Sequence, residues 1–401
     1  MRLSGRHFTE AEQSELVALL QRLIQFPTED PPGRELELAR FVRDTLAASG
    51  FTSNLVEFQP GRANVVARLK GQGERPGLVF SAHLDTLPAG EGTWQFPPFE
   101  GHVSDGRVYG RGASDMKGGL AAMMAAAQRL AREDLPLRGD LILAFSAGES
   151  SNGLGAKQMV ADGSLEGAGA LLISEPTTLT IVVAEKGALW LKAIATGMPG
   201  HPSGAGGSQG TGENAILKLV SFINRLRDFE PETPAHPLLD EPTIAVNTIA
   251  GGSAINLTPD RAELGLDIRY LPGMSAEEIV GDLRAVADSG GLEIAFEILD
   301  DKPPVETAPD HPFVRLCQES YRASLGRRPE FSRSEGAQAP LGGASYFSDA
   351  AVLCPALDLP RVIIGPGEMG MSGQRDEYVQ IERLNAAADI YVEIALDFLL
   401  R

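Results

Sequence analysis

Short, continuous apolar runs alternate with amphipathic segments over the first half of the chain. Apolar runs of strand length occupy residues 64–69, 77–82, 141–147 and 170–174. Apolar residues at helical spacing separate them, notably in the Ala-, Met- and Leu-rich stretch 116–132. Continuous apolar strands alternating with helices are typical of a largely parallel sheet that is covered on both faces. The pattern therefore predicts an α/β fold.

The pattern changes near residue 187. Strands are predicted at 189–196, 243–250, 262–270 and 292–298, and helices at 212–228 and 275–288. This α+β segment ends at a proline-rich stretch, and the remainder returns to the α/β pattern and closes with a helix from about residue 381. We expect a catalytic domain in two parts, 1–186 and 303–401, with a smaller domain inserted at 187–302.

Composition narrows the range of partners. The 401 residues include 54 acidic and 35 basic side chains, a formal net charge of −19, and such a surface would repel the phosphates of nucleic acid. Apolar runs fall short of the roughly 18–20 residues that span a bilayer, so no membrane partner is expected. Two cysteines and a polar N-terminal segment favour the cytoplasm. With six histidines, any metal site must rely mainly on carboxylates.

Three of the apolar runs are followed by a histidine or a carboxylate, namely His83 with Asp85, Glu149, and Glu175. The carboxyl ends of strands are where open α/β sheets bind ligands. Asp115, just before a predicted helix, is a fourth candidate. Imidazole with carboxylates suits zinc, manganese or cobalt, and a carboxylate in the position of Asp85 can orient the histidine ring. A glutamate beside a metal-bound water is the expected general base.

These residues lie in longer motifs that extend over most of the chain. The motifs are SAHLDT at 81–86, GRGASDMKGG at 110–119, SEPT at 174–177, DIR at 267–269 and GPG at 365–367. In them the chain resembles the metallopeptidase and amidohydrolase family of carboxypeptidase G, acetylornithine deacetylase, succinyl-diaminopimelate desuccinylase and aminoacylase. The resemblance implies a zinc-peptidase-like catalytic domain with an inserted ferredoxin-like lid, through which such proteins usually form homodimers.

The resemblance also implies roles for the residues at the strand ends. His83, Asp115 and Glu175 would bind the first metal ion, and Asp115 would normally bridge to a second. Glu149 would be the general base, and Asp85 would support His83.

Three further residues in the inserted domain match positions that act on the substrate in this family. His201 would reach the active site of the partner subunit and stabilise the oxyanion. Asn256 and Arg269 would hold the substrate, Arg269 through a carboxylate.

Two positions depart from the family pattern. The usual pair of glutamates, base then ligand, is Glu149 followed by Ser150, and the usual histidine before Asp-Glu-Tyr is Gly373. Both substitutions affect the second metal, whereas the first set is complete. We therefore predict one divalent transition metal ion per chain and no second ion. Arg375, close to the lost histidine, would bind a substrate carboxylate in the space that is left.

The predicted function is hydrolysis of a C–N bond in a small carboxylate-bearing substrate, with a metal-activated water and Glu149 as general base. Within this class, an aminohydrolase that deaminates an aromatic amine such as 5-nitroanthranilate is an alternative. A two-metal peptidase with Ser150 or Asp376 as substitute ligand is another. From a different class, the chain would be a non-catalytic ligand-binding protein, although such a protein has no need of a general base.

Overall fold

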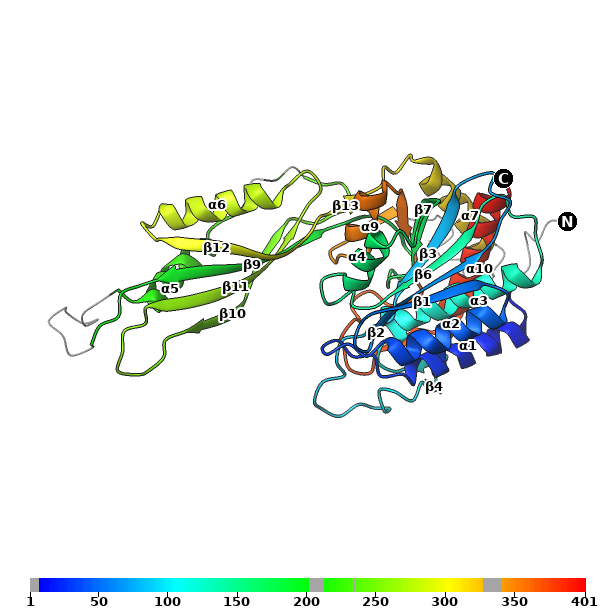
Figure 1. Cartoon of the computed structure of the whole chain (residues 1–401), viewed down its shortest axis with the longest axis horizontal. Coiled ribbons are helices and arrows are strands. Elements are labelled where there is room, and N and C mark those ends of the chain that lie inside the picture. The colour runs from blue at the N-terminus through cyan, green and yellow to red at the C-terminus, as the bar shows by residue number, and fades with distance from the viewer. Residues whose placement is uncertain (1–6, 202–212, 232, 234, 327–340) are drawn as a thin grey trace. The chain divides into compact units, whose positions relative to one another are not determined.

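The computed structural model describes residues 7–201, 213–231, 233, 235–326 and 341–401. Contacts divide the chain into two compact units (Figure 1). The first comprises Met1–Val183, Glu306–Gly343 and Ser348–Arg401, and the second comprises Ala184–Val305 and Ala344–Phe347. The second unit is thus inserted into the first, and it also takes in a short segment from the C-terminal part of the chain.

A nine-stranded sheet forms the centre of the first unit, in the order β1-β2-β6-β3-β7-β15-β8-β13 with β14 beside β8. The central strands β6, β3, β7 and β15 are parallel, whereas β1, β2 and β8 pair antiparallel with their neighbours. The sequence predicted the parallel centre and also the strand at 64–69, which is β2, but it did not indicate that the outer strands run antiparallel. The strands are β1 Thr52–Gln59, β2 Arg62–Leu69, β3 Gly77–His83, β6 Leu141–Ser146, β7 Ala168–Ile173, β8 Ile181–Glu185, β13 Val305–Glu306, β14 Leu341–Ala344 and β15 Arg361–Ile363.

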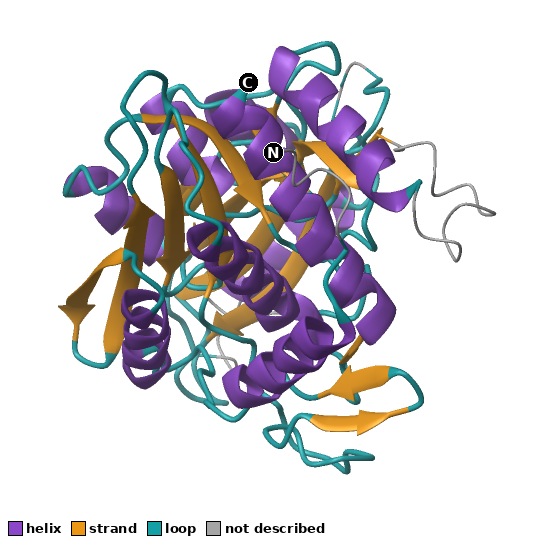
Figure 2. Cartoon of the chain, turned by 90° about the vertical axis from the view of Figure 1, so that its right-hand side faces the viewer, coloured by secondary structure: helices purple, strands orange, loops and turns teal. Residues whose placement is uncertain are grey.

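Helices cover both faces of this sheet. Every residue of β3 and of β6 is buried, and because successive side chains point to opposite faces, both faces must be covered. Figure 2 shows several helices in front of the strands. None of the helices in the described residues is long and apolar enough to cross a membrane. The helices are α1 Glu10–Ile24, α2 Leu36–Ala48, α3 Gly118–Arg132, α4 Leu154–Ala161, α7 Pro312–Leu325, α9 Ala350–Leu357 and α10 Ile381–Leu400.

A small three-stranded sheet brings together two parts of the first unit that are far apart in sequence. β16 (Tyr378–Gln380) pairs antiparallel with β5 (Arg107–Tyr109), which pairs with β4 (His102–Ser104). The chain then passes through the short turn η1 (Ala113–Lys117) into α3. Because β16 lies against β5, the residues just before β16 meet the segment that carries Asp115.

The second unit has the element order β9-α5-β10-β11-α6-β12. Its antiparallel sheet, in the order β10-β11-β9-β12, has the ferredoxin-like arrangement that the resemblance implied. Buried and partly exposed residues alternate along β11, because α5 and α6 cover one face of the sheet. Gly212, in the predicted first helix, lies outside the described residues. The elements are β9 Gly187–Thr196, α5 Ala215–Leu226, β10 Thr243–Gly251, β11 Arg261–Tyr270, α6 Ala276–Asp288 and β12 Ile294–Lys302.

Candidate metal centre

Three parallel strands end side by side at one edge of the large sheet. β3 lies between β6 and β7, and His83 at its end is opposite Ser146, the last residue of β6. Glu149 therefore follows β6 close to His83, and Glu175 follows β7 on the other side. The alternation of strands and helices thus places these side chains at the carboxyl edge of the sheet, as expected for this class of fold.

His83, Asp115 and Glu175 converge on one point. His83 Nε2 lies 3.0 Å from Asp115 Oδ1 and 3.7 Å from Glu175 Oε1, and the three potential ligand atoms lie within 4.8 Å of one another. Across the part of the chain that the structure describes, no other three His, Cys, Asp or Glu side chains are clustered in this way. One imidazole nitrogen with two carboxylate oxygens is a donor set that zinc accepts, so the residues fit a divalent ion.

The charges around this point also suit a cation. Burial raises the pKa of Glu175, and the nearby Asp115 and Glu149 add to the shift, although His83 opposes it. Burial by itself would lower the pKa of His83, but the surrounding carboxylates outweigh burial and raise it. The centre is therefore a group of buried and half-buried carboxylates around a single imidazole. A bound cation would relieve the repulsion among the carboxylates.

Asp85 has a different contact from the one we expected. His83 Nδ1 lies 2.9 Å from the backbone carbonyl oxygen of Asp85, but 3.8 Å from its carboxylate. The carboxylate instead accepts hydrogen bonds from the backbone N–H groups of Gly148, Glu149 and Ser150, at 2.8, 3.1 and 3.1 Å. Because three donors hold the carboxylate, the main-chain carbonyl orients the imidazole. Asp85 therefore supports both His83 and the turn that carries Glu149.

Asp115 is held by the carboxylate of Glu377, which precedes β16. Glu377 accepts hydrogen bonds from the backbone N–H groups of Gly112, Ser114 and Asp115, at 3.0, 2.9 and 2.9 Å. It also pairs with the buried guanidinium of Arg111 at 2.6 Å. The sequence motif that ends in Asp-Glu-Tyr marked this region, but not the role of Glu377 in fixing the backbone around Asp115.

The second carboxylate oxygen of Asp115 also has a partner. Asp115 Oδ1 faces His83, and Asp115 Oδ2 accepts a hydrogen bond from the hydroxyl of Ser372. Ser372 immediately precedes Gly373, where the family would have its histidine, and Gly373 has a positive φ of 72°. Sequence reasoning did not identify Ser372, because a serine beside a glycine in a turn carries no signal of its own.

A further buried carboxylate, Asp349, lies near the centre. Its Oδ2 accepts a hydrogen bond from the hydroxyl of Ser146, whereas its Oδ1 has no partner within the described part of the chain. Burial raises the pKa of Asp349 to about 6. Burial likewise raises the pKa of Glu149, and the charge of Asp349 raises it further, against the effect of His83. Nothing in the sequence indicated the hydrogen bond between Ser146 and Asp349, which joins residues far apart in the chain.

The remaining predicted residues are not part of this cluster. His201, Asn256 and Arg269 belong to the second unit, where His201 and Asn256 are exposed. Arg269 pairs with Asp267 through contacts of 2.8 and 3.0 Å, and its guanidinium lies 5.3 Å from the ring centre of Phe347. The roles that we assigned to these three residues stay predictions.

Arg375 lies in an exposed turn of the first unit. Its guanidinium packs against Gly92, where an added methyl group would come within 2.6 Å of Nη1. The neighbouring carboxylates are bonded elsewhere, because Asp376 accepts from the N–H of Gln95 at 2.6 Å and Glu377 holds the Asp115 segment. Within the described residues, Arg375 takes part in no ion pair.

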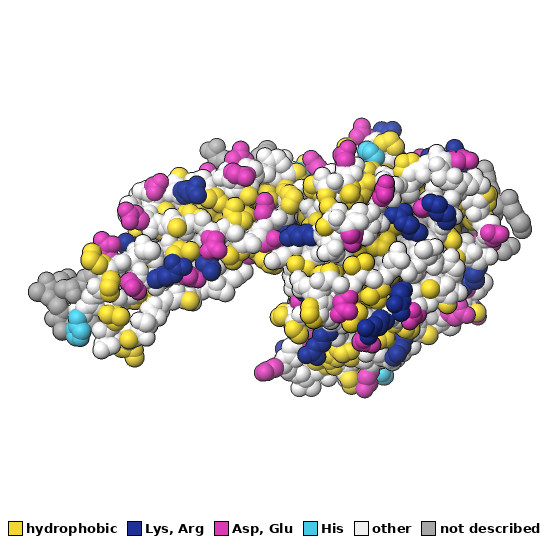
Figure 3. Space-filling view, viewed as in Figure 1, with side chains coloured by type: hydrophobic (Ala, Val, Ile, Leu, Met, Phe, Trp, Pro, Cys, Tyr) yellow, Lys and Arg dark blue, Asp and Glu magenta, His cyan; other side chains and the backbone are white. Residues whose placement is uncertain are grey.

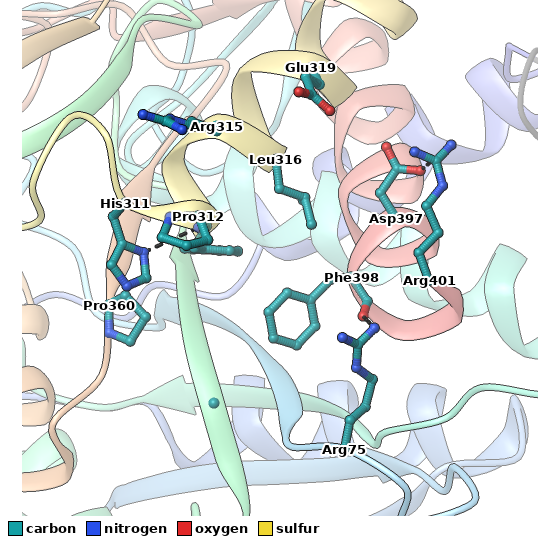
Figure 4. Close-up of a pocket in the computed structure, with 12 residues that line it drawn as sticks. Arg75, His311, Pro312, Arg315, Leu316, Glu319, Pro360, Asp397, Phe398 and Arg401 are labelled. Carbon is teal, nitrogen blue, oxygen red and sulfur yellow. Dashed lines mark hydrogen bonds and ion pairs between the residues drawn. The ribbon is translucent and has the colours of Figure 1, made fainter.

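The first unit also has a pocket of about 540 Å³ that is lined by none of these residues (Figure 4). Arg75, on the pocket wall, lies just before the start of β3. His83 lies at the other end of that strand, about 20 Å from its start. In the pocket, Arg75 donates to the carbonyl of Phe398 at 2.7 Å, and Arg401 pairs with Asp397 at 3.0 Å. The pocket therefore lies at the edge of the sheet where the parallel strands begin, and it does not belong to the metal centre at their carboxyl ends.

The sequence pattern of peptidase family M20/M25/M40 matches residues 79–397. The chain belongs to this family. It is 27% identical to a probable succinyl-diaminopimelate desuccinylase of Staphylococcus epidermidis, over 96% of this chain and 98% of that protein. It is 30% identical to an acetylornithine deacetylase of Vibrio campbellii, over 85% and 86%. A dinuclear metal-binding peptidase of the family from Bacillus subtilis has the same fold, with a TM-score of 0.70 at 17% identity over 98% and 99% of the two chains.

Family membership defines the broad chemistry. Members of the family are metal-dependent hydrolases of amide and peptide bonds, and this chain is therefore such an enzyme. The donor set of His83, Asp115 and Glu175 agrees with a metal-dependent reaction. The alternative of a non-catalytic binding protein is thereby left without support.

Proposed function

We propose that the enzyme hydrolyses the amide bond of small N-acylated substrates that carry a carboxylate, with one divalent ion such as zinc, manganese or cobalt. The observation that carries the proposal is the convergence of His83, Asp115 and Glu175, with Ser150 and Gly373 where a second ion would need ligands. Two relatives are named for removing a succinyl and an acetyl group, which supports an acyl amide as the bond that is cleaved.

The bound ion would supply Lewis-acid activation of a water molecule. Glu149 would accept a proton from the attacking water and deliver it to the leaving nitrogen, while a C–O bond forms and the C–N bond breaks. Its environment supports this role, because burial and Asp349 raise the pKa of the Glu149 carboxylate well above the ordinary range for glutamate. A base with a raised pKa holds the transferred proton more readily near neutral pH.

We propose Arg375 as the main anchor for the substrate carboxylate. It is close to the missing histidine in sequence, and its guanidinium is not used by any ion pair among the described residues. A planar guanidinium can bind a carboxylate through two parallel hydrogen bonds. Asn256 and Arg269 would contact the substrate from the inserted unit, and His201 would stabilise the oxyanion in the partner subunit's site.

We further propose that the chain forms a homodimer through the second unit, in the cytoplasm. β10 is an edge strand of its sheet, and Val246 and Ile249 on it are each more than 40% exposed. An exposed edge with apolar side chains is suited to pairing with another chain. Figure 3 shows exposed hydrophobic side chains among the charged groups on this unit. Both cysteines are buried and form no disulfide, which supports a reducing compartment.

A panel of substrates tests the proposed reaction. N-acetyl and N-succinyl amino acids should be hydrolysed, and their carboxamide analogues, which lack the free carboxylate, should be poor substrates. Arg375→Ala should raise KM for the carboxylate substrates at least tenfold and leave the poor turnover of the carboxamides unchanged. Ammonia release from aminobenzoates, with no acyl hydrolysis, would replace this proposal with the aromatic aminohydrolase.

A further inference from the structure

We infer that the hydroxyl of Ser372 takes the place of a second metal ion beside Asp115, and so makes the centre a one-ion site. This inference rests on the proposed one-ion function, and it attributes the exclusion of a second ion to one side chain. Ser372 would not contact the substrate. It would act by positioning a metal ligand.

The contact is specific to one oxygen of Asp115. Oδ1 lies 3.0 Å from His83 Nε2, on the side of the three-residue donor set. Oδ2 accepts the hydroxyl hydrogen of Ser372. A carboxylate that bridges two ions commonly offers one oxygen to each. In this chain the second oxygen already has a hydrogen-bond donor, and a second ion would have to displace it.

The backbone on both sides of this contact is fixed. The N–H of Asp115 donates to Glu377 at 2.9 Å, and the carbonyl of Gly373 accepts from Arg111 Nη2 at 3.0 Å. Arg111 and Glu377 are themselves an ion pair, buried between the two segments. Ser372 and Asp115 are therefore held on two segments that one buried pair connects. The fold therefore fixes the positions of both partners of this hydrogen bond.

The same contact has a second effect, on the ion that does bind. A hydrogen bond to the outer oxygen of a ligating carboxylate fixes its rotation, so that the other oxygen faces the ion. Loss of such a supporting partner typically lowers metal affinity by about 10–100-fold. Ser372 should thus strengthen the first site as well as block the second.

The first test compares two substitutions of nearly equal shape. Ser372→Thr keeps the hydroxyl, and Ser372→Val replaces it with a methyl group. Both are titrated with Co²⁺ and Zn²⁺ by visible absorption and calorimetry. We expect the threonine variant to bind within about threefold of the unaltered protein, and the valine variant to bind about 10–100-fold more weakly. Equal affinity of the two variants would overturn the inference.

The second test restores the missing ligands. Ser150→Glu with Gly373→His supplies both absent side chains, and the same pair is also made with Ser372→Ala. Histidine is among the residues that tolerate the positive φ of position 373. Metal content after dialysis against Zn²⁺ should be one ion per chain when Ser372 is present and two when it is absent. The same number in both proteins would overturn the inference.

These results separate the inference from the proposed function. Two ions in the unaltered protein would contradict the one-ion function itself. One ion in the unaltered protein, together with equal binding by the threonine and valine variants, would contradict the role of Ser372 alone.

Discussion

Replacing Glu377 with alanine should destabilise the first unit strongly and weaken its metal binding. The substitution removes a carboxylate that accepts hydrogen bonds from three backbone N–H groups and pairs with Arg111 at 2.6 Å. Arg111 is 2% exposed, so its charge would remain buried without a carboxylate to pair with. Because the same bonds fix the backbone of Asp115, the metal ligand should also lose its position.

The size of the effect follows from these contacts. Removing one partner of a buried ion pair costs about 3–5 kcal/mol. The three backbone N–H groups that lose their acceptor add to this cost unless water reaches them. Taking about 4 kcal/mol, and about 2–4 °C per kcal/mol for a domain of roughly this size, the midpoint of thermal unfolding should fall by about 8–16 °C.

The assay is thermal unfolding of the metal-free protein, followed by circular dichroism, with calorimetric metal titration of the folded protein. Glu382→Ala is the matched control, because Glu382 is exposed and should change the midpoint by only a few degrees. Combining Glu377→Leu with Arg111→Met removes both charges and should recover much of the lost stability. A midpoint and metal affinity that Glu377→Ala leaves unchanged would refute this account of the Asp115 segment.

Three further predictions concern catalysis and assembly. Glu149→Gln should reduce kcat by about 10²–10⁴-fold without changing metal content. Full activity of this variant would show that Glu149 is not the general base. Asp349→Asn removes a charge that raises the pKa of Glu149, so the acid limb of the pH profile of kcat/KM should move to lower pH; a shift to higher pH would contradict the assignment. Ile249→Lys should convert the proposed dimer to monomers in sedimentation velocity, whereas Val103→Lys, at an exposed position of the first unit, should not.

The parts of the site that the sequence predicted are those that follow from strand order. His83, Glu149 and Glu175 each follow a continuous apolar run, and parallel strands bring their carboxyl ends to one edge. The antiparallel edge strand β1 was not predicted, because its half-buried pattern lacks a continuous apolar run. Pattern alone thus identifies buried central strands more readily than edges.

The contacts that escaped prediction depend on tertiary structure. Ser372 contacts Asp115, 257 residues away in sequence, and Asp349 contacts Ser146, 203 residues away. The periodicity of apolar residues carries no information about such contacts. Asp85 shows a different limit. Its residue type suited contact with His83, but three N–H groups of the Glu149 turn compete for the carboxylate, and their arrangement appears only in the folded chain.

The number of metal ions per chain distinguishes a one-ion centre from a two-ion centre. The protein is purified without chelators, dialysed against excess Zn²⁺ and then against metal-free buffer, and its metal content is measured by mass spectrometry. His83→Ala serves as a control for ions bound elsewhere. We expect one ion per chain in the unaltered protein and none in the control. Two ions per chain, both lost in the control, would contradict this expectation.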